Sequence, residues 1–144
     1  MLLVPEKLNF RLSTTDLEVI YTESSGVRLK VEVQTFSDFK NDKYSEAELQ
    51  FNNVAELKCT SLNFYEFHHG EFVIESINND VVGYWEKKDI HSDPGVYMVS
   101  SSEVLESRGA IYDPNNRLSL KHFIVVGYDS YVEIISSNYE VRVE

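Results

Sequence analysis

Histidine supplies the first candidate chemistry, because its side chain can act as a general base or bind a metal near neutral pH. The chain has four histidines, of which His68 and His69 are adjacent. Neighbouring residues of a strand point to opposite faces, so these two could share a metal only if Gly70 places them in a turn. Zinc pairs usually show wider spacing, such as i and i+4. We therefore expect no metal site and no cofactor.

The other two histidines lie in different surroundings. His122 belongs to an apolar run and shares one face with Ile124 and Val126 if that run is a regular strand. A histidine in that position is typically a hydrogen-bonded core residue rather than a catalyst. His91 lies beside the turn Asp93-Pro94-Gly95 and is expected to be exposed. If the protein is an enzyme, His122 with nearby acids is the first place to look.

Nucleophile and nucleotide-binding motifs are missing from the sequence. The single cysteine, Cys59, has no catalytic signature around it, and we interpret it as a buried, inert thiol. No Gly-x-Ser-x-Gly elbow, Walker loop or dinucleotide fingerprint occurs. The segment Asp38–Asp42 spaces oxygen ligands as a calcium loop does, but the central glycine and final glutamate are absent. We predict a solvated, charged loop there and no catalytic residue.

Aromatic residues next to acids indicate a binding surface. The chain has nine Tyr, eight Phe and one Trp. Exposed Tyr and Trp are enriched at binding hot spots, although the same residues also pack well inside sheets. Our candidate binding residues are the aromatics and neighbouring acids of three short regions: Tyr65, Glu66, Glu71, Tyr84, Trp85, Glu86, Tyr128 and Asp129.

The net charge of −11, from 24 acidic and 13 basic residues, restricts the possible partners. Nucleic acids and anionic membranes are both expected to repel such a chain. A basic protein is the partner that this charge favours, because opposite charge steers association. Glu46 and Glu48 form an acidic stretch that could contribute to such a surface. The alternative is that the charge serves solubility alone.

The length of the chain, and a sequence that no linker or low-complexity segment divides, favour one small domain spanning residues 1–144. The segment Met1–Glu6 lacks the basic region of a secretory signal, and runs such as Phe123–Val126 are far shorter than the ~20 residues of a membrane span. One cysteine allows no intramolecular disulfide, which fits a reducing compartment. The expected location is therefore the cytoplasm.

Alternation of apolar and polar residues predicts strands along most of the chain. The clearest case is Val27–Phe36, which Ser24-Ser25-Gly26 connects to a preceding strand as a hairpin. The last 25 residues read as three strands, Leu120–Val126, Tyr131–Ile135 and Tyr139–Val143, separated by turn formers. Antiparallel sheets with one dry face and one wet face give this pattern.

The middle of the chain is less regular. Phe72–Ile77 and Val81–Trp85 are predicted to form a second hairpin around Asn78-Asn79-Asp80. A short helix is indicated by a capping box from Ser100 to Glu103, with Gly109 closing it. The predicted fold is mainly β: one antiparallel sandwich or partly closed barrel of about nine or ten short strands, with at most one or two short helices. An α+β fold is the alternative.

These properties favour a small acidic, non-enzymatic binding protein. In size, acidity and strand-rich organisation, the chain is similar to small acidic bacterial immunity and antitoxin-like proteins, which bind and block a basic toxin. The similarity implies an inhibitor that masks a basic protein partner. A small-ligand-binding β module with an aromatic-lined pocket and an enzyme built from scattered His, Asp and Glu residues stay open. Homo-oligomerisation through an edge strand such as Tyr139–Val143 also stays open, although its charges are typical of protected edges.

Overall fold

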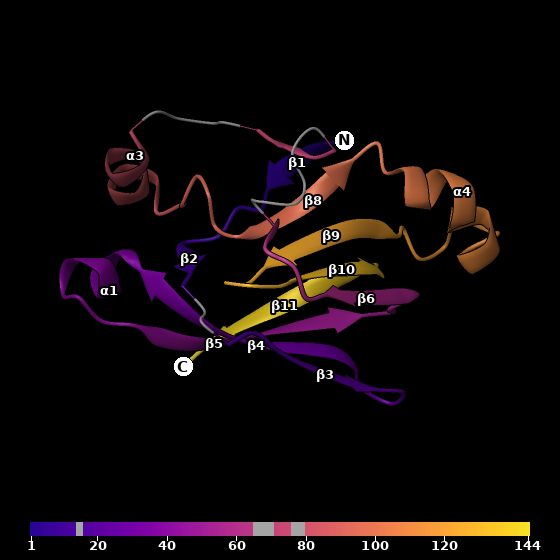
Figure 1. Ribbon diagram of the computed structural model, residues 1–144, viewed down its shortest axis with the longest axis horizontal. Helices are drawn as coiled ribbons and strands as arrows, with labels where there is room; N and C mark the ends of the chain where they lie inside the picture. Colours follow the sequence, from indigo (N-terminus) through magenta and orange to yellow (C-terminus); the bar gives the residue numbers. More distant parts are fainter. Residues whose placement is uncertain (14–15, 65–70, 76–79) are drawn as a thin grey trace.

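The computed structural model describes residues 1–13, 16–64, 71–75 and 80–144, and these residues form eleven strands and three short helices (Figure 1). The strands build two sheets that lie over one another. The prediction of a mainly-β sandwich or partly closed barrel is confirmed. The described residues contain one strand and one helix more than the upper numbers that the sequence predicted.

The six-stranded sheet has the order β6-β10-β9-β8-β1-β7. All its neighbours are antiparallel except β1 and β7, which are parallel. Its strands are β1 (Leu2–Pro5), β6 (Glu56–Thr60), β7 (Val73–Ile74), β8 (Val96–Ser100), β9 (Lys121–Val126) and β10 (Tyr131–Ser136). The predicted strands β9 and β10 lie inside this sheet, which explains why both carry apolar residues on both faces.

The five-stranded sheet has the order β11-β5-β4-β2, with β3 also pairing to β4. Its strands are β2 (Phe10–Leu12), β3 (Glu18–Thr22), β4 (Gly26–Thr35), β5 (Ser45–Asn52) and β11 (Asn138–Val143). The predicted hairpin of β3 and β4 is present. Alternate residues of β4 and β5 point inward and outward, so this sheet has one apolar face and one charged face.

The chain passes between the two sheets twice at a shared corner. β5 leads into β6, and β10 leads into β11, through adjacent bends. At these bends Ser137 N–H donates to the Asn52 carbonyl at 3.2 Å, and Ala55 N–H donates to the Ile135 carbonyl at 2.8 Å. Bends of this kind turn the corner of a sandwich and join its layers. As a result, β11 pairs with β5 rather than with β10, its neighbour in sequence.

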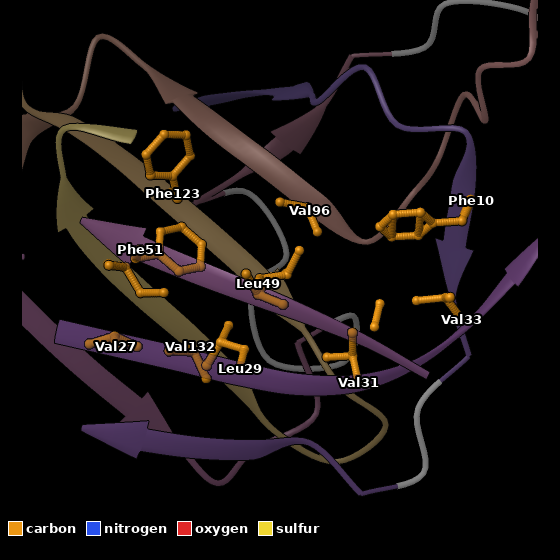
Figure 2. Packing of buried hydrophobic residues seen from close by; sticks show 13 residues of the cluster. Phe10, Val27, Leu29, Val31, Val33, Leu49, Phe51, Val96, Phe123 and Val132 are labelled. Atoms are coloured by element: carbon orange, nitrogen blue, oxygen red, sulfur yellow. The ribbon is translucent and has the colours of Figure 1, made fainter. Parts of the chain in front are cut away.

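The main core lies between the two sheets (Figure 2). It is built from the inward side chains of both layers: Phe10, Val27, Leu29, Val31, Val33, Ala47, Leu49, Phe51, Val96, Phe123, Val125, Val132 and Ile134. Burial of each large side chain contributes about 1.5–3 kcal/mol to folding. A second apolar cluster, which includes Leu3, Tyr97, Ile124 and Tyr131, covers part of the outer face of the six-stranded sheet.

The segment Asp38–Asp42 is not the charged loop that we predicted, because Phe36–Lys40 forms helix α1. The Thr35 hydroxyl accepts the Asp38 N–H at 3.2 Å, and the Asp38 carboxylate accepts the Thr35 N–H at 3.1 Å. This reciprocal pair is a capping box, which starts a helix. The bond from the Thr35 backbone also lowers the pKa of Asp38. The sequence does contain the Thr35-x-x-Asp38 spacing of a capping box, but we interpreted its oxygen-bearing residues as an incomplete calcium loop.

The predicted second hairpin is wrong, because Val81–Lys88 forms helix α3. The Asp80 carboxylate caps this helix by accepting the Gly83 N–H at 3.1 Å. Val81 and Trp85 are one helical turn apart, and burial of Trp85 outweighs the strand propensity of the valines. Its proposed partner strand is reduced to β7, which pairs with β1; residues 76–79 lie outside the described part.

Helix α4 (Glu103–Tyr112) confirms the short helix predicted before the C-terminal strands. Its cap is Ser102 rather than Ser100, and the helix continues past Gly109 to Tyr112. An interior glycine weakens a helix by only about 1 kcal/mol, so Gly109 does not have to end it. No residue of α4 is buried, so the helix lies on the outside of the six-stranded sheet. Figure 1 shows it at the opposite end of the molecule from α1 and α3.

Candidate functional site

A groove of about 380 Å³ lies on the charged, outer face of the five-stranded sheet. Strand alternation positions its side chains, because every second residue of a strand faces the same side. Its charged lining residues are Asp16, Glu18, Arg28, Lys30, Glu32, Glu46, Glu48 and Glu144. Six carboxylates against two cations give the groove a formal charge of −4.

One row of side chains across this face is electrically balanced. Glu18, Lys30 and Glu48 lie directly opposite one another on β3, β4 and β5, and Arg142 of β11 completes the row. Arg28 adds an ion pair to Glu48, with 3.8 Å between Nη1 and Oε1. Opposite charges on directly facing strand positions stabilise a sheet. This row therefore serves the fold.

In the adjacent row, the described residues on β4, on β5 and directly after β11 are acids. Glu32 of β4 lies directly opposite Glu46 of β5, and the Glu144 N–H donates to the Glu46 carbonyl at 2.8 Å. Neighbouring strands are about 4.8 Å apart, so these three carboxylates are close, and like charges in such positions are destabilising. Within the described residues, no group of His, Cys, Asp or Glu side chains has the arrangement of a metal site. These three carboxylates therefore concentrate negative charge at one end of the groove.

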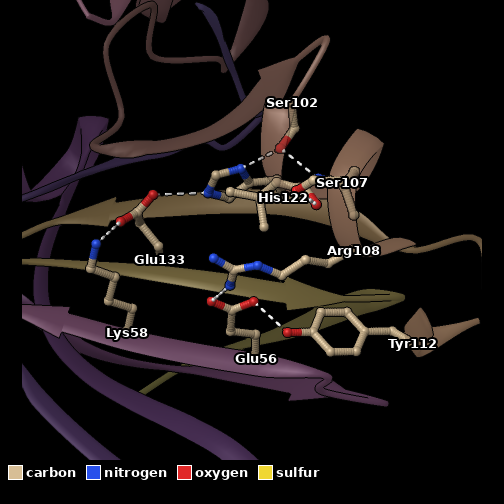
Figure 3. A network of polar contacts seen from close by, with 10 residues as sticks. Glu56, Lys58, Ser102, Ser107, Arg108, Tyr112, His122 and Glu133 are labelled. Atoms are coloured by element: carbon tan, nitrogen blue, oxygen red, sulfur yellow. Dashed lines mark hydrogen bonds and ion pairs between the residues drawn. The ribbon is translucent and has the colours of Figure 1, made fainter. Parts of the chain in front are cut away.

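A second polar cluster lies beneath α4, on the outer face of the six-stranded sheet (Figure 3). His122 of β9 is only 1% exposed. Its Nδ1 lies 2.7 Å from the Ser102 hydroxyl, and its Nε2 lies 3.0 Å from Oε1 of Glu133 on β10. A carboxylate can only accept, so in the neutral imidazole Nε2 carries the proton and Nδ1 accepts from Ser102. The prediction of a buried, hydrogen-bonded histidine is confirmed.

Glu56 of β6 provides the second anchor for α4. Its carboxylate accepts from Arg108 Nη1 at 2.6 Å and from the Tyr112 hydroxyl at 2.7 Å. Partial burial raises the pKa of Glu56, but the hydrogen bonds from Tyr112 and Arg108 outweigh burial and lower the pKa overall. Glu56 is thus ionised at neutral pH, and two separate turns of α4 are tied to one carboxylate.

This cluster is better suited to holding a helix than to catalysis. Both ring nitrogens of His122 are engaged, and the Ser102 hydroxyl also caps α4 by accepting the Leu105 N–H at 3.3 Å. The adjacent cavity, bounded by His122, Glu133 and Glu56, measures about 70 Å³. Ligand pockets usually measure about 300–1,000 Å³. Polar anchors replace the buried apolar face that most surface helices use.

The structure separates the predicted binding residues. Tyr65 and Glu66 lie outside the described residues, as do His68 and His69. Glu71 is exposed, and its backbone carbonyl accepts from the amino group of Met1. In the turn between β9 and β10, Tyr128 is 67% exposed and Asp129 is exposed. None of these described residues lines the acidic groove.

Trp85 of α3 lies in the interior, where it cannot serve as a surface anchor. It is 1% exposed, and its indole N–H donates to the Asn9 carbonyl at 2.7 Å. Its ring contacts those of Phe36 and Phe39 on α1, at 5.4 and 5.5 Å between centroids. Its neighbours in sequence, Tyr84 and Glu86, are half-buried and exposed, respectively. Trp85 therefore joins α1 and α3 to the sandwich.

Two single residues differ from expectation. His91 is buried rather than exposed, because its ring packs edge-on against Trp85 and its Nδ1 accepts the Asp93 N–H at 2.9 Å. Burial, together with the charge of Arg11, lowers the pKa of His91. Cys59 is exposed rather than buried, because β6 is an edge strand. Partial desolvation raises the pKa of its thiol, so the reactive thiolate is scarce at neutral pH.

Sequence reasoning identified Glu46 and Glu48 but missed most of the groove. Asp16, Glu32 and Glu144 come from distant parts of the chain, and only strand register brings them together. The alternation of Arg28, Lys30 and Glu32 along one strand was the available signal, since it marked a charged sheet face. That pattern alone did not indicate which strands lie beside it.

Comparison of the chain with protein families, curated proteins and solved structures gave no significant match. None of the helices in the described ranges has the length and apolar character needed to cross a membrane.

Proposed function

We propose that the protein binds a basic segment of a protein partner in the acidic groove and inhibits that partner by masking the segment. The observation that supports this proposal is the row of Glu32, Glu46 and Glu144, which face one another across neighbouring strands. Folding alone disfavours such a row, since like charges directly opposite one another are destabilising. Lys or Arg side chains of a partner would relieve that repulsion on binding.

The rest of the molecule supports the same partner chemistry. The net charge of −11 produces a field that attracts basic proteins from a distance. The groove is open and lined by charged side chains, and aromatic residues are absent from its described lining. It therefore favours a basic segment over an apolar small molecule. The proposed mechanism is steric, so it requires no cofactor and no catalytic residue.

The experiment uses a fluorescein-labelled oligolysine peptide as the probe and fluorescence anisotropy as the readout. The triple variant E32Q/E46Q/E144Q removes three charges from the groove. We expect it to weaken peptide binding by at least about tenfold at low ionic strength. Wild-type binding should weaken as salt is added, because exposed charges are screened.

The matched control is the triple variant E23Q/E86Q/E106Q, which removes three exposed acids outside the groove. Both variants have the same net charge, so an attraction due to overall charge would fall equally in the two. We expect the control to change the dissociation constant by less than about twofold. Equal losses in the two variants would overturn the proposal of a specific groove.

A further inference from the structure

Strand β11 is an edge strand whose outer side is exposed. It pairs with β5 on one side, and it ends the order of the five-stranded sheet. Residues 140–144 are all exposed. Val141 and Val143 point toward the core side of the sheet, opposite Leu49 and Ala47, yet they remain 37% and 44% exposed. An exposed edge of this length is a template for another strand.

The direction of the backbone groups along this edge follows from the ladder with β5. The Glu144 N–H donates to the Glu46 carbonyl, so the even-numbered residues of β11 exchange hydrogen bonds with β5. Backbone groups alternate along an antiparallel strand. The N–H and C=O groups of Tyr139, Val141 and Val143 therefore point to the free side. These three residues can bond to an added strand without disturbing the existing ladder.

The charges along β11 are complementary to the same strand turned by two-fold symmetry. We propose that β11 pairs antiparallel with β11 of a second copy, with the symmetry axis at Val141. In this register Val141 faces its own copy, Tyr139 faces Val143, and Glu140 faces Arg142. Each Glu140 then meets an Arg142 of the other copy on the outer face of the joined sheet. Two symmetric ion pairs and a continuous ten-stranded sheet result.

The charge pattern also selects this register over its neighbours. A slip that centres the pairing on Glu140 places that carboxylate against its own copy. A slip in the other direction places Arg142 against its own copy. Like charges directly opposite are destabilising, whereas the register centred on Val141 opposes unlike charges twice. Isolated charges protect an edge from any strand. Alternating charges of opposite sign reject other registers while accepting a copy of themselves.

The first experiment measures the oligomeric state of the full chain by sedimentation velocity over a range of concentrations at low salt. The interface is small, so we expect a reversible dimer that forms with rising concentration. The single variants E140R and R142E place like charges opposite each other in the dimer and should weaken it by at least about tenfold each. A 1:1 mixture of the two variants restores unlike charges at both positions and should form the heterodimer.

A backbone variant tests the hydrogen bonds separately. V141P removes an N–H that points to the free side, so the ladder with β5 loses no bond, and edge strands tolerate proline in such positions. We expect V141P to abolish dimerisation, whereas V141T keeps the N–H and should dimerise. Circular dichroism and thermal unfolding identify any variant that fails to fold, and the charge variants then provide the test.

Three outcomes overturn the proposal. The first is a wild-type chain that stays monomeric at every concentration. The second is dimerisation that E140R and V141P leave unchanged, because the contact would then lie elsewhere. The third is a mixture of folded E140R and R142E chains that remains monomeric while the wild type dimerises. The groove variants used above test a different property, so the two proposals can fail independently.

Discussion

Replacing Glu46 by Gln should make the protein more stable while weakening its binding to a basic segment. Glu46 faces Glu32 on β4 and Glu144 beyond β11. Glu48 is two residues further along the same strand and points to the same face, but its neighbours are Lys30 and Arg142. E46Q and E48Q provide a matched test, since the two substitutions are chemically identical but should change the stability of the fold in opposite directions.

The magnitude follows from the spacing of the strands. Carboxylates on directly opposite positions lie about 6 Å apart, which corresponds to a repulsion of about 0.7 kcal/mol in water. An ionic strength of about 0.15 M reduces this value by roughly half. Because E46Q removes this repulsion from two acidic neighbours, the variant should be more stable than the wild type by about 0.6 kcal/mol. This corresponds to a rise in Tm of about 2 °C. E48Q should lose about 0.5–1 kcal/mol, because it gives up attraction to cations.

Urea denaturation of the wild type, E46Q and E48Q at low salt and at about 1 M salt measures both effects. At high salt the Debye length is about 3 Å, so the two variants should converge toward the wild type. The reasoning would be refuted if E46Q were no more stable than the wild type at low salt. It would also be refuted if the two substitutions changed stability in the same direction.

H122A should lower the free energy of unfolding by about 3 kcal/mol in urea denaturation, because it leaves a buried cavity and removes one hydrogen bond each from the Ser102 hydroxyl and the Glu133 carboxylate. A loss under about 1 kcal/mol would contradict the anchoring of α4. Because the pKa of Glu56 is lowered in the folded state, its stabilisation is fully present above its unfolded value of 4.5 and is lost as the pH falls through the folded pKa. Thermal unfolding between about pH 5 and pH 3 should therefore show a smaller fall in Tm for E56Q than for the wild type, and equal falls would exclude this contribution. W85A should cost about 4 kcal/mol in chemical denaturation, since it leaves a large cavity and removes the bond to Asn9; W85F should cost clearly less, and equal losses would show that ring packing contributes little.

The sequence predicted the fold well wherever one face of a strand is buried and the other is exposed to solvent. In β4, four inward apolar residues alternate with charged ones, and burial requires that pattern. The prediction failed at α3, where Val81 and Val82 suggested a strand. There the Asp80 cap and the burial of Trp85 decided the structure, and burial depends on tertiary contacts that local propensity does not contain.

The groove was harder to predict because it depends on strand register. The sequence indicated Glu46 as part of an acidic stretch. Glu144 lies 98 residues later, and only the pairing that joins its N–H to the Glu46 carbonyl places it beside Glu46. No local pattern in the sequence contains that information. Among the aromatic candidates, Trp85 was chosen for its residue type, and its burial removes it from the surface. The acidic composition favours a basic partner, but composition does not indicate where on the surface such a partner would bind.

The corner at which the chain passes between the sheets, after β5 and after β10, has a consequence for folding during synthesis on the ribosome. β5 is synthesised early, but one of its edges stays open until β11 arrives, since the contact of Asn52 with Asn138 spans 86 residues. Contacts of such long range form slowly. Until residues 138–143 leave the exit tunnel, Phe51 and Phe123 also lack the ring of Tyr139 that packs against both. The nascent chain should therefore resist a protease only after its last strand has emerged, and earlier intermediates should depend on chaperones that cover open strand edges.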